Sequence, residues 1–392
     1  MNDLRALPSL ACAGFASMAS MRMCDAMLPA LGQAFGTRPA DAALTVSAFA
    51  LAYGLLQLLY GPLGDRFGKP RVVTVAAFGC AVASLIAALA PSLELLSAGR
   101  MLMGAFAAGV IPLTMAWIGD RVPYERRQQV LAHLLTYTVL GMMLGSWAGG
   151  AIAQVANWRI AFIAVGMLFL GSAIGIARAA RDDQEAPAES GTDRYLVRVR
   201  SLLELPWARV VFAVVFIEGA LVFGALAFVP TALHDRFQLS LVEAGGVAAL
   251  FGLGGLLYSR VAGRLVRSLG TPLLAGRGAT CVAVALATLA AMPSAAFAVP
   301  ACLLAGLGFY MLHNTLQTCA TQLSTSARGT GVSMFACALF LGQSGGVLAA
   351  SIVVDRLSTT VWFALASPLL LVLGAYFASR LRVHLSIRQV TA

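Results

Sequence analysis

Charged residues are scarce in this sequence. Asp, Glu, Lys and Arg make up 11% of the 392 residues, whereas hydrophobic residues make up 59%. Soluble globular proteins carry about 25% charged residues, so this chain could not cover a folded surface with polar groups in water. The mean hydropathy of +0.84 has the same implication. The composition excludes a water-soluble globular protein and predicts a protein of the lipid bilayer.

Signatures of ATP-driven or zinc-dependent chemistry are also missing. The sequence has no Gly-x-x-x-x-Gly-Lys-[Ser/Thr] phosphate loop and no His-Glu-x-x-His motif. Its seven cysteines lie in apolar runs, without a Cys-x-x-Cys pair or a metal-type spacing to the four histidines. We therefore predict that the protein is not an enzyme and has neither a metal site nor a cofactor. An ion gradient is expected to supply the energy for any work it does.

Long apolar runs are what the sequence has instead. Twelve stretches of about 20 apolar residues alternate with short polar breaks. They predict an all-α membrane protein of twelve transmembrane helices, with unbroken helices at residues 8–35, 94–119 and 207–232 among them.

One stretch rich in charge, residues 181–205, interrupts the apolar pattern. It is expected to be a cytoplasmic linker between an N-terminal bundle, residues 1–180, and a C-terminal bundle, residues 206–392. The end of the linker, residues 195–205, mixes Leu and Val with Arg and can form an amphipathic helix on the inner membrane surface.

Positive charge is distributed unevenly over the predicted loops. If the N-terminus is cytoplasmic, the inner loops and tails hold nineteen Lys and Arg residues, whereas the outer loops hold only Arg38, Arg159, Arg236 and Arg356. Cytoplasmic loops of membrane proteins carry such an excess. We predict a multi-pass protein of the inner membrane with both termini cytoplasmic. The net charge of +10 is then a signal of topology rather than of nucleic-acid binding.

The most distinctive polar stretch runs from residue 61 to residue 71, Gly-Pro-Leu-Gly-Asp-Arg-Phe-Gly-Lys-Pro-Arg, between two apolar runs. Its glycines allow positive φ angles and its charges must reach water or headgroups, so a short hydrophilic loop between two helices is expected. The stretch resembles the loop between helices 2 and 3 of the major facilitator superfamily of transporters. Residues expected to act there as a conformational switch are Gly61, Gly64, Asp65, Arg66, Gly68 and Arg71.

The resemblance implies that Asp65 latches the two halves of the protein on the inner side, by holding a helix end of the opposite half. The sequence Arg328-Gly329-Thr330 is the expected partner. A weaker copy of the loop occurs at residues 263–272, with an offset of 202 residues. This internal repeat predicts two pseudo-symmetric six-helix bundles, the major facilitator fold, with a site at their interface.

Two charged residues in the first apolar run, Arg22 and Asp25, are candidates for proton coupling. A charged group in the middle of a membrane helix costs about 2.5–3.5 kcal/mol, so a carboxyl there can take up a proton on one side and release it on the other. The alternative is that Asp25 merely pairs with Arg22, three residues back on the same helical face, or with Arg100 of the fourth helix. Arg100 opens a sequence that resembles the helix 4 motif of the superfamily, which implies that it tunes the nearby acid. A purely structural arginine is the alternative there.

Glu218 is the second acid expected inside the membrane. It is a candidate proton or substrate site, and a structural ion pair with an arginine such as Arg260 is the alternative. Polar side chains at helical spacing predict the lining of a central cavity, although hydrogen bonds between helices explain the same stripes. The predicted lining residues are Tyr53, Gln57, His313, Asn314 and Gln317.

The fifth apolar run carries glycines at positions 141, 145, 149 and 150. Small residues at four-residue spacing predict a close helix contact. The pattern Gly141, Gly145, Gly149 and Gly150 also resembles the antiporter motif of the drug exporters in the superfamily, with Ser146 in place of a proline. The run Asp25-Ala-Met-Leu-Pro-Ala-Leu31 resembles the bicyclomycin-resistance-like branch of drug:proton antiporters.

Together these features predict a proton-coupled secondary transporter that exports small amphipathic compounds such as drugs by alternating access. The resemblance, not the composition, implies export. The expected partners are protons, a small-molecule substrate and the lipid bilayer, without nucleic acid, and the protein is expected to be a monomer. Two alternatives stay open: another carrier of the same superfamily, for metabolite efflux or proton-coupled uptake, and a non-transporting membrane sensor on the same scaffold.

Overall fold

The computed structural model of the protein describes residues 5–179, 192–324 and 328–391. In these ranges every regular element is a helix, as the composition predicts. Ten helices of the described part are long and apolar enough to cross a membrane. The predicted number of twelve is not reached on this criterion, because α1 (Leu7–Arg22) has only 16 residues and α13 (Leu241–Ala291) counts once although it bends at Gly270.

The chain divides into two compact units. Unit 1 comprises Met1–Leu196 with Ser240–Gly245, and unit 2 comprises Val197–Leu239 with Gly246–Ala392. The predicted bundle limits, 1–180 and 206–392, stay a prediction. Residues 181–191 of the predicted linker lie outside the described residues.

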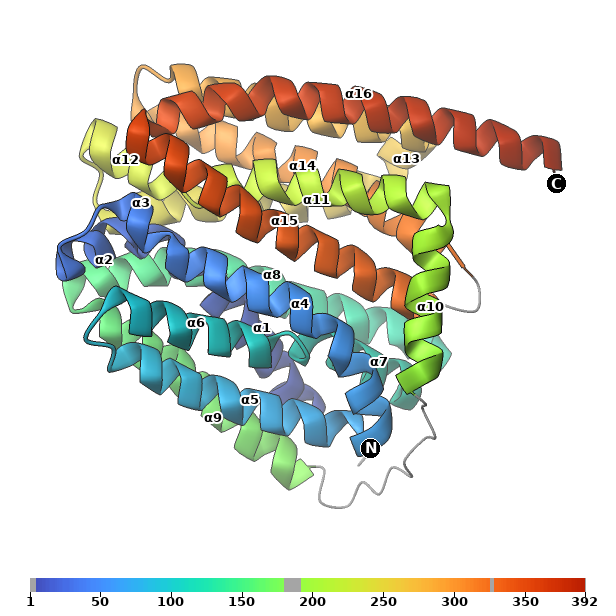
Figure 1. Ribbon diagram of the computed structural model, residues 1–392, viewed down its shortest axis with the longest axis horizontal. Helices are drawn as coiled ribbons and strands as arrows, with labels where there is room; N and C mark the ends of the chain where they lie inside the picture. The colour runs from blue at the N-terminus through green and yellow to red at the C-terminus, as the bar shows by residue number, and fades with distance from the viewer. Residues whose placement is uncertain (1–4, 180–191, 325–327, 392) are drawn as a thin grey trace. The chain divides into compact units, whose positions relative to one another are not determined.

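Unit 1 is built from pairs of long helices that pack along their lengths: α1 with α8, α4 with α6, and α5 with α9 (Figure 1). Small residues line these contacts, and the buried face of α1 consists largely of Ala, Ser and Gly, which lets the helix backbones approach closely. After α1 the helices of this unit are η2 (Asp25–Met27), α2 (Leu28–Phe35), α3 (Pro39–Ala42), α4 (Leu44–Phe67), α5 (Lys69–Ala88), α6 (Leu93–Ala107), α7 (Val110–Arg121), α8 (Tyr124–Val155) and α9 (Trp158–Ala179).

Unit 2 is organised around α11 and α15, which lie side by side, with α14 and α16 packed against them (Figure 1). The helices of the second half are α10 (Thr192–Glu204), α11 (Pro206–Leu226), α12 (Val229–Phe237), α13, η4 (Ala295–Phe297), α14 (Ala298–Thr321), α15 (Arg328–Arg356) and α16 (Thr359–Thr391). Gly270, with φ 69° and ψ 160°, divides α13 into two arms.

Three apolar runs that we predicted as unbroken helices are interrupted. The breaks lie at residues 23–27, 108–109 and 227–228, ahead of Pro29, Pro112 and Pro230. Proline has no N–H for the carbonyl four residues earlier, and its ring clashes with that carbonyl. Each break follows this rule, so the predictions for residues 8–35, 94–119 and 207–232 are wrong in the same way. In the first break the carbonyl released in this way belongs to Asp25.

The predicted loop at residues 61–71 is much shorter than expected. Helix α4 continues to Phe67 and α5 begins at Lys69, so only Gly68 leaves the helical conformation, with φ 87° and ψ 126°. Charged side chains at a helix end can reach water without unwinding the backbone. The prediction of a hydrophilic loop is therefore wrong: a single residue, Gly68, turns the chain between the two helices.

The 202-residue repeat seen in the sequence is also present in the backbone. The described residues with positive φ are Gly36, Gly68, Gln238 and Gly270. They form two pairs, Gly36 with Gln238 and Gly68 with Gly270, each 202 residues apart. Gly36 and Gln238 end the short helices α2 and α12, respectively, in the left-handed conformation. The two halves therefore turn at equivalent positions.

Helix starts follow the same repeat. The backbone N–H of Arg38 donates to the side chain of Asp41 at 3.2 Å, and the backbone N–H of Ser240 donates to the side chain of Glu243 at 2.9 Å. Each is an acidic capping interaction at the start of a helix, again 202 residues apart.

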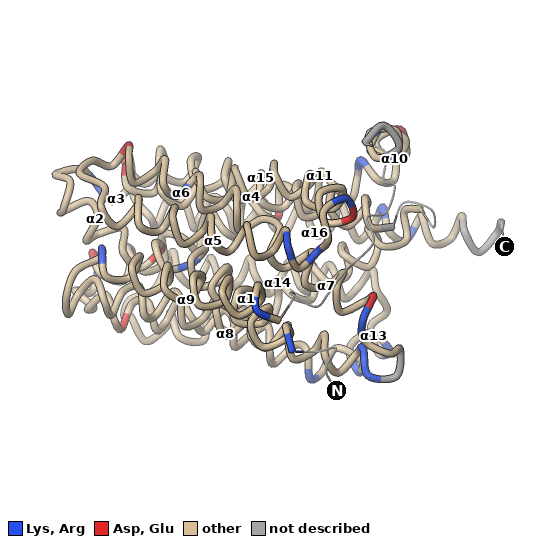
Figure 2. The backbone as a smooth tube through the Cα atoms, turned by 90° about the horizontal axis from the view of Figure 1, so that it is seen from below, with Lys and Arg blue, Asp and Glu red and all other residues tan. Residues whose placement is uncertain are grey.

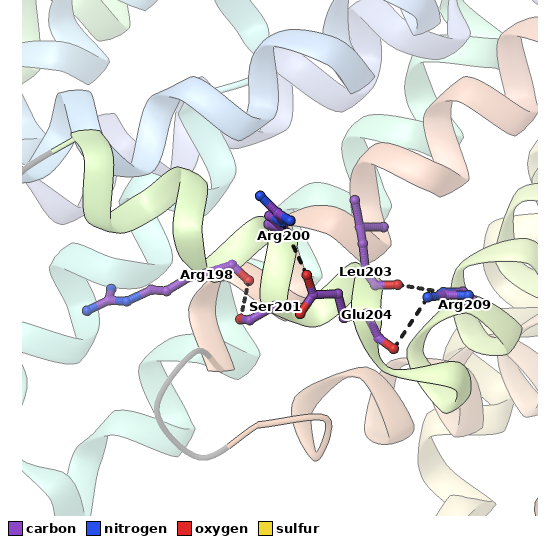
Figure 3. A network of polar contacts seen from close by, with 6 residues as sticks. All are labelled: Arg198, Arg200, Ser201, Leu203, Glu204 and Arg209. Atoms are coloured by element: carbon purple, nitrogen blue, oxygen red, sulfur yellow. Dashed lines mark hydrogen bonds and ion pairs between the residues drawn. The ribbon is translucent and has the colours of Figure 1, made fainter.

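The predicted amphipathic helix in the linker is observed as α10, and the chain turns directly from it into α11 (Figure 3). The Arg209 side chain on α11 donates to the carbonyls of Leu203 (2.6 Å) and Glu204 (3.4 Å), which are among the last carbonyls of α10. A cation that binds these free carbonyls stabilises the helix end. The location of α10 on the inner membrane surface stays a prediction.

Charged residues lie mostly toward the ends of the long helices, whose middle parts carry few of them (Figure 2). The outward faces between those ends expose large apolar side chains, for example Val75 (64% exposed) and Met167 (62%). A helix that is apolar along its outward face and charged at its ends is suited to lie across a bilayer.

Candidate functional site

Asp25 lies in the break between α1 and α2, deep inside unit 1. Its Oδ2 accepts a hydrogen bond from Nη1 of Arg22 at 3.0 Å, and both side chains are almost fully buried, 2% and 3% exposed. The other carboxylate oxygen, Oδ1, has no hydrogen-bond partner among the described residues. The structure therefore shows the pairing of Asp25 with Arg22 that the sequence left open as an alternative. One carboxylate oxygen of Asp25, Oδ1, remains available as an acceptor.

Arg100 ties three helices of unit 1 together. From α6 its Nη1 donates to the carbonyl of Ser20 on α1 (2.8 Å) and its Nε donates to the carbonyl of Thr45 on α4 (3.2 Å). The guanidinium lies over the ring of Phe49, 4.3 Å from its centroid, in a cation–π contact. Fully buried, Arg100 acts as a clamp between helices and adds a second permanent positive charge near Asp25.

Glu218 occupies the corresponding interior of unit 2, in the middle of α11. Its side chain is fully buried, and its Oε2 lies 3.0 Å from Nδ1 of His313 on α14. Oε1 has no hydrogen-bond partner within the described ranges. The pairing with Arg260 that we considered is wrong: that arginine is exposed, and the acid's partner is a histidine 95 residues away.

His313 is held by aromatic rings. It stacks on Phe309 (centroids 4.8 Å apart, planes at 17°) and is tilted against Phe335 at 5.1 Å. Phe309 in turn packs edge-on against Phe223 of α11 at 5.2 Å. The imidazole keeps 13% of its surface exposed, whereas the carboxylate it contacts has none. The histidine is therefore the more accessible end of the pair.

Gln343 is a residue that the sequence did not single out. It is 1% exposed on α15, and neither atom of its amide has a hydrogen-bond partner in the described part. Such an atom is uncommon in a folded interior. Gln343 lies close to Glu218 along the helix contact: a Cβ added at Gly219, the residue after Glu218, would be 3.2 Å from the backbone nitrogen of Gln343. In the sequence, the feature that could have pointed to Gln343 is a polar residue inside an otherwise apolar run.

Residues 342–346, Gly-Gln-Ser-Gly-Gly, have the spacing Gly-x-Ser-x-Gly that some hydrolases place on a strand-to-helix turn. Here they lie inside α15. A Cβ at Gly342 or Gly346 would meet the backbone carbonyl of Phe216 or Ala220 on α11, respectively. The pattern therefore serves helix packing.

The two predicted polar stripes differ in burial. Tyr53 and Gln57 on α4 are buried, and Oε1 of Gln57 has no hydrogen-bond partner in the described ranges. On α14, His313 and Asn314 are half-buried and Gln317 is exposed. That these residues line a cavity stays a prediction.

The glycines of α8 face α1 in register. A Cβ at Gly141, Gly145 or Gly149 would meet the backbone of Phe15, Ala19 and Met23, respectively, so the ladder advances four residues at a time on both helices. Gly150 lies outside this ladder, because a Cβ there would meet the backbone carbonyl of Leu241 at the start of α13 and would lie 3.1 Å from the Cβ of Ala26. The close helix contact predicted from the spacing is confirmed, whereas a role in antiport stays a prediction.

The residues predicted to act as a conformational switch surround the turn between α4 and α5. Lys69, the single lysine of the sequence, has its Nζ 2.8 Å from Asp120 on α7 and 3.6 Å from Asp65 on α4. A Cβ at Gly64 would overlap Leu113, so this glycine allows α7 to approach. Gly61, Arg66 and Arg71 have exposed side chains or surfaces. The latch between Asp65 and the start of α15 stays a prediction.

Comparison with known proteins identifies the family. The model of the Major Facilitator Superfamily matches residues 10–347 of this chain. An uncharacterized MFS-type transporter of Bacillus subtilis, YwfA, is 26% identical over 341 residues, which cover 85% of this chain and 81% of the relative. The multidrug efflux pump LfrA of Mycolicibacterium smegmatis is 31% identical over 137 residues, which cover 35% of this chain and 27% of the pump.

A solved structure has the same fold. The crystal structure of the POT family transporter PepTSo superimposes with a TM-score of 0.80 at 14% sequence identity, covering 97% of this chain and 98% of that one. At this identity the likeness shows the fold alone. With the family model matching most of the chain, and with helices suited to a bilayer, the protein is a multi-pass membrane transporter, not an enzyme, and belongs to the Major Facilitator Superfamily.

Proposed function

We propose that the protein is a proton-coupled exporter of small amphipathic compounds, drugs among them, in a bacterial plasma membrane. The observation that carries the proposal is the buried ion pair of Asp25 and Arg22 at a helix break, with one carboxylate oxygen unpartnered. Membership in the superfamily and the partial similarity to a multidrug efflux pump support it. The resemblance of residues 25–31 to the bicyclomycin-resistance-like branch agrees with this direction.

The proposed coupling begins at Asp25. A carboxylate buried with an arginine is stable only as long as the pair is intact, because separating the charges leaves each one in a medium of low dielectric. When Asp25 binds a proton, its hold on Arg22 weakens and the segment at residues 23–27 is released from one constraint. Residues 25–27 form a short 3₁₀ turn instead of continuing the α-helix, and a 3₁₀ stretch inside a helix often acts as a hinge, so this segment is where the proposed change of conformation takes place.

The proposed transport cycle is alternating access between the two halves, 1–180 and 206–392, joined by residues 181–205. Both termini are cytoplasmic in this proposal, and the protein acts as a monomer with protons and a small molecule as its cargo. Arg100 tunes the acid of unit 1, while Asp65 and the α8 glycines control which conformation is favoured. Tyr53, Gln57, His313, Asn314 and Gln317 contribute to the cavity.

Transport of ethidium, a fluorescent amphipathic cation, into inverted membrane vesicles tests the direction and the coupling. In inverted vesicles export appears as uptake, so an acid interior is expected to drive ethidium inward. Asp25→Asn is expected to abolish the gradient-driven component, because the amide neither binds the proton nor pairs as an anion with Arg22. Asp41→Asn is the matched control, since Asp41 is exposed on α3 in the same unit.

Three results would count against the proposal. Gradient-driven movement out of inverted vesicles would indicate uptake by the cell. Normal coupling in Asp25→Asn would remove the assigned role of the carboxyl. Absence of flux for ethidium and for a panel of other drugs and metabolites, with a well-folded protein, would favour the sensor.

A further inference from the structure

The two buried acids have partners of different chemistry. Asp25 is paired with Arg22 and lies near Arg100, and a guanidinium keeps its proton under all physiological conditions. Glu218 is paired with His313, and an imidazole gains or loses its proton near neutral pH. The charge that neutralises the acid is thus permanent in unit 1 and changeable in unit 2.

Proton accounting follows from the 3.0 Å contact between Oε2 of Glu218 and Nδ1 of His313. With a neutral imidazole, Nδ1–H donates to the carboxylate and the pair has a charge of −1. One proton from water, bound at Nε2, makes the pair neutral, either as imidazolium and carboxylate or as neutral imidazole and carboxylic acid after transfer through the hydrogen bond. A neutral pair costs less to bury than a charged one, so the apolar interior favours uptake of that proton.

The surroundings of His313 favour the same proton. The ring of Phe309 lies parallel to the imidazole and Phe335 lies close beside it, and the face of an aromatic ring attracts a cation. Because His313 is 13% exposed and Glu218 is fully buried, a proton from solvent meets the imidazole first.

The other ionisable side chains in the middle of the surrounding helices are uncharged at physiological pH. Within the described residues, His313 is the ionisable side chain that contacts Glu218. The remaining titratable groups that the helices packed around the pair contribute along their middle parts are neutral at physiological pH. They are Tyr258 and Cys281 on α13, Cys302 and Tyr310 on α14, Cys337 on α15 and Tyr376 on α16.

Charged residues on these helices lie elsewhere. On α15, Asp355 is twelve residues beyond Gln343, about 18 Å along the helix. On α16, Arg380 follows Phe377, which stacks on Trp207 at the start of α11, eleven residues before Glu218. Arg260 of α13 is exposed. Among the described residues of these helices, no arginine or lysine forms an ion pair with Glu218 as Arg22 does with Asp25.

We propose that Glu218 and His313 form a second proton-binding site, separate from Asp25, in which the proton enters at Nε2 of His313 and the Nδ1 proton passes through the hydrogen bond to the carboxylate of Glu218, which leaves a neutral imidazole beside a carboxylic acid. The role of this site in transport rests on the proposed function, whereas the binding of the proton does not. If the protein is a proton-coupled exporter, each cycle then couples to two sites, one in each unit.

Infrared titration of the full-length protein in lipid nanodiscs tests the binding without any substrate. A buried carboxyl has a C=O stretching band when it is protonated and loses it when ionised. A band of this kind that belongs to Glu218 is expected to titrate in the wild type, to disappear in Glu218→Gln and to persist in Asp25→Asn, whereas a band of protonated Asp25 is lost only in Asp25→Asn. In His313→Gln its midpoint is expected to move by at least one pH unit, because the carboxyl loses its hydrogen-bond partner. Glu243→Gln, at an exposed acid of α13, is the control and should leave the band unchanged.

The proposal is overturned if no band depends on Glu218, if the band assigned to Glu218 is lost in Asp25→Asn, or if His313→Gln leaves the midpoint where it was. Should Glu218→Gln fail to fold, dicyclohexylcarbodiimide labels the wild type instead. The O–H of a protonated carboxyl adds across a C=N bond of this reagent, and peptide mass spectrometry locates the adduct. Labelling of Glu218 that rises as the pH falls, with a different midpoint in His313→Gln, supports the site. Absence of labelling at Glu218 throughout contradicts it.

Ethidium transport separates this proposal from the function on which its role depends. If the band titrates but ethidium and the drug panel are not transported, the proton site stands and the exporter fails. If ethidium transport is proton-driven and its proton stoichiometry is the same in the wild type and in Glu218→Gln, the exporter stands and the two-site coupling is overturned.

Discussion

At the residue scale, the buried ionisable side chains are each committed to a particular partner. Arg22 binds Asp25 and His313 binds Glu218. Nη2 of Arg100 has no hydrogen-bond partner among the described residues, whereas its Nη1 and Nε donate to backbone carbonyls of two other helices. A guanidinium is suited to the last task because its donors form a rigid planar fork, whereas an ammonium is a compact point charge. Arg100 is thus a structural clamp that also contributes charge to the site.

Arg100→Lys is therefore expected to destabilise the protein although the charge is kept. A lysine cannot reach Ser20 and Thr45 together, and each lost hydrogen bond to a charged group costs about 1.5–3 kcal/mol. The thermal unfolding midpoint, followed by tryptophan fluorescence in detergent, is expected to fall by several degrees. Arg71→Lys, at an exposed arginine of α5, is the control and should leave it unchanged. An unaltered midpoint in Arg100→Lys would show that the fork geometry is unimportant.

At the element scale, glycine and proline decide how the helices pack and where they stop. Proline four residues downstream interrupts the first helix of each half and the fourth apolar run, and the first of these breaks places Asp25 outside a regular helix. Glycine at four-residue spacing lets α8 approach the backbone of α1. Proline acts because it lacks a backbone N–H, and glycine acts because it lacks a Cβ.

Gly141→Ala tests the contact between α8 and α1. The added methyl group would meet the carbonyl of Phe15, and such overpacking costs about 1–3 kcal/mol. It opposes the gain of about 1 kcal/mol in helix propensity from Gly to Ala. We expect a lower unfolding midpoint and a smaller monodisperse fraction in size-exclusion chromatography. Gly171→Ala on α9, where a Cβ meets nothing within 4 Å, should instead be neutral or stabilising. Equal behaviour of the two variants would contradict the close packing.

At the scale of the whole molecule, the repeat preserves turns rather than chemistry. Positive φ angles and capping interactions recur 202 residues apart. The charged residues do not: the position equivalent to Asp25 is Ala227, and the position equivalent to Glu218 is Ala16. Each half therefore has the same backbone plan with its own buried acid, placed differently and paired differently.

Gly68→Ala and Gly270→Ala test the equivalence of the two halves. Both glycines have positive φ with extended ψ, a conformation that costs a residue with a side chain about 1–3 kcal/mol. Each variant is expected to lower the unfolding midpoint by a similar amount, while Gly61→Ala, at a helical glycine with no atom within 4 Å of its Cβ position, should not. Tolerance of alanine at one of the two sites but not at the other would show that the turns are not equivalent.

The membrane class, the helical content and the 202-residue repeat could be predicted from the sequence alone. These depend on composition and on spacing along the chain, which remain visible without a structure. The proline breaks could also have been predicted from the sequence, because a proline disturbs the helix only as far as four residues back. We missed them because the apolar runs continue through the breaks. The glycine ladder of α8 was likewise local in its spacing, and its contact with α1 is confirmed.

Pairing between residues far apart in the sequence was decided only by the tertiary structure. Nothing along the chain connects Glu218 with His313, which lies 95 residues away, or Arg100 with the carbonyl of Ser20, 80 residues away. Arg22 and Asp25 could be paired in advance because three residues bring them together on one turn. A charge inside a bilayer must find a partner, and that much follows from solvation. Which partner it finds depends on how helices distant in sequence pack, and packing is a property of the folded chain.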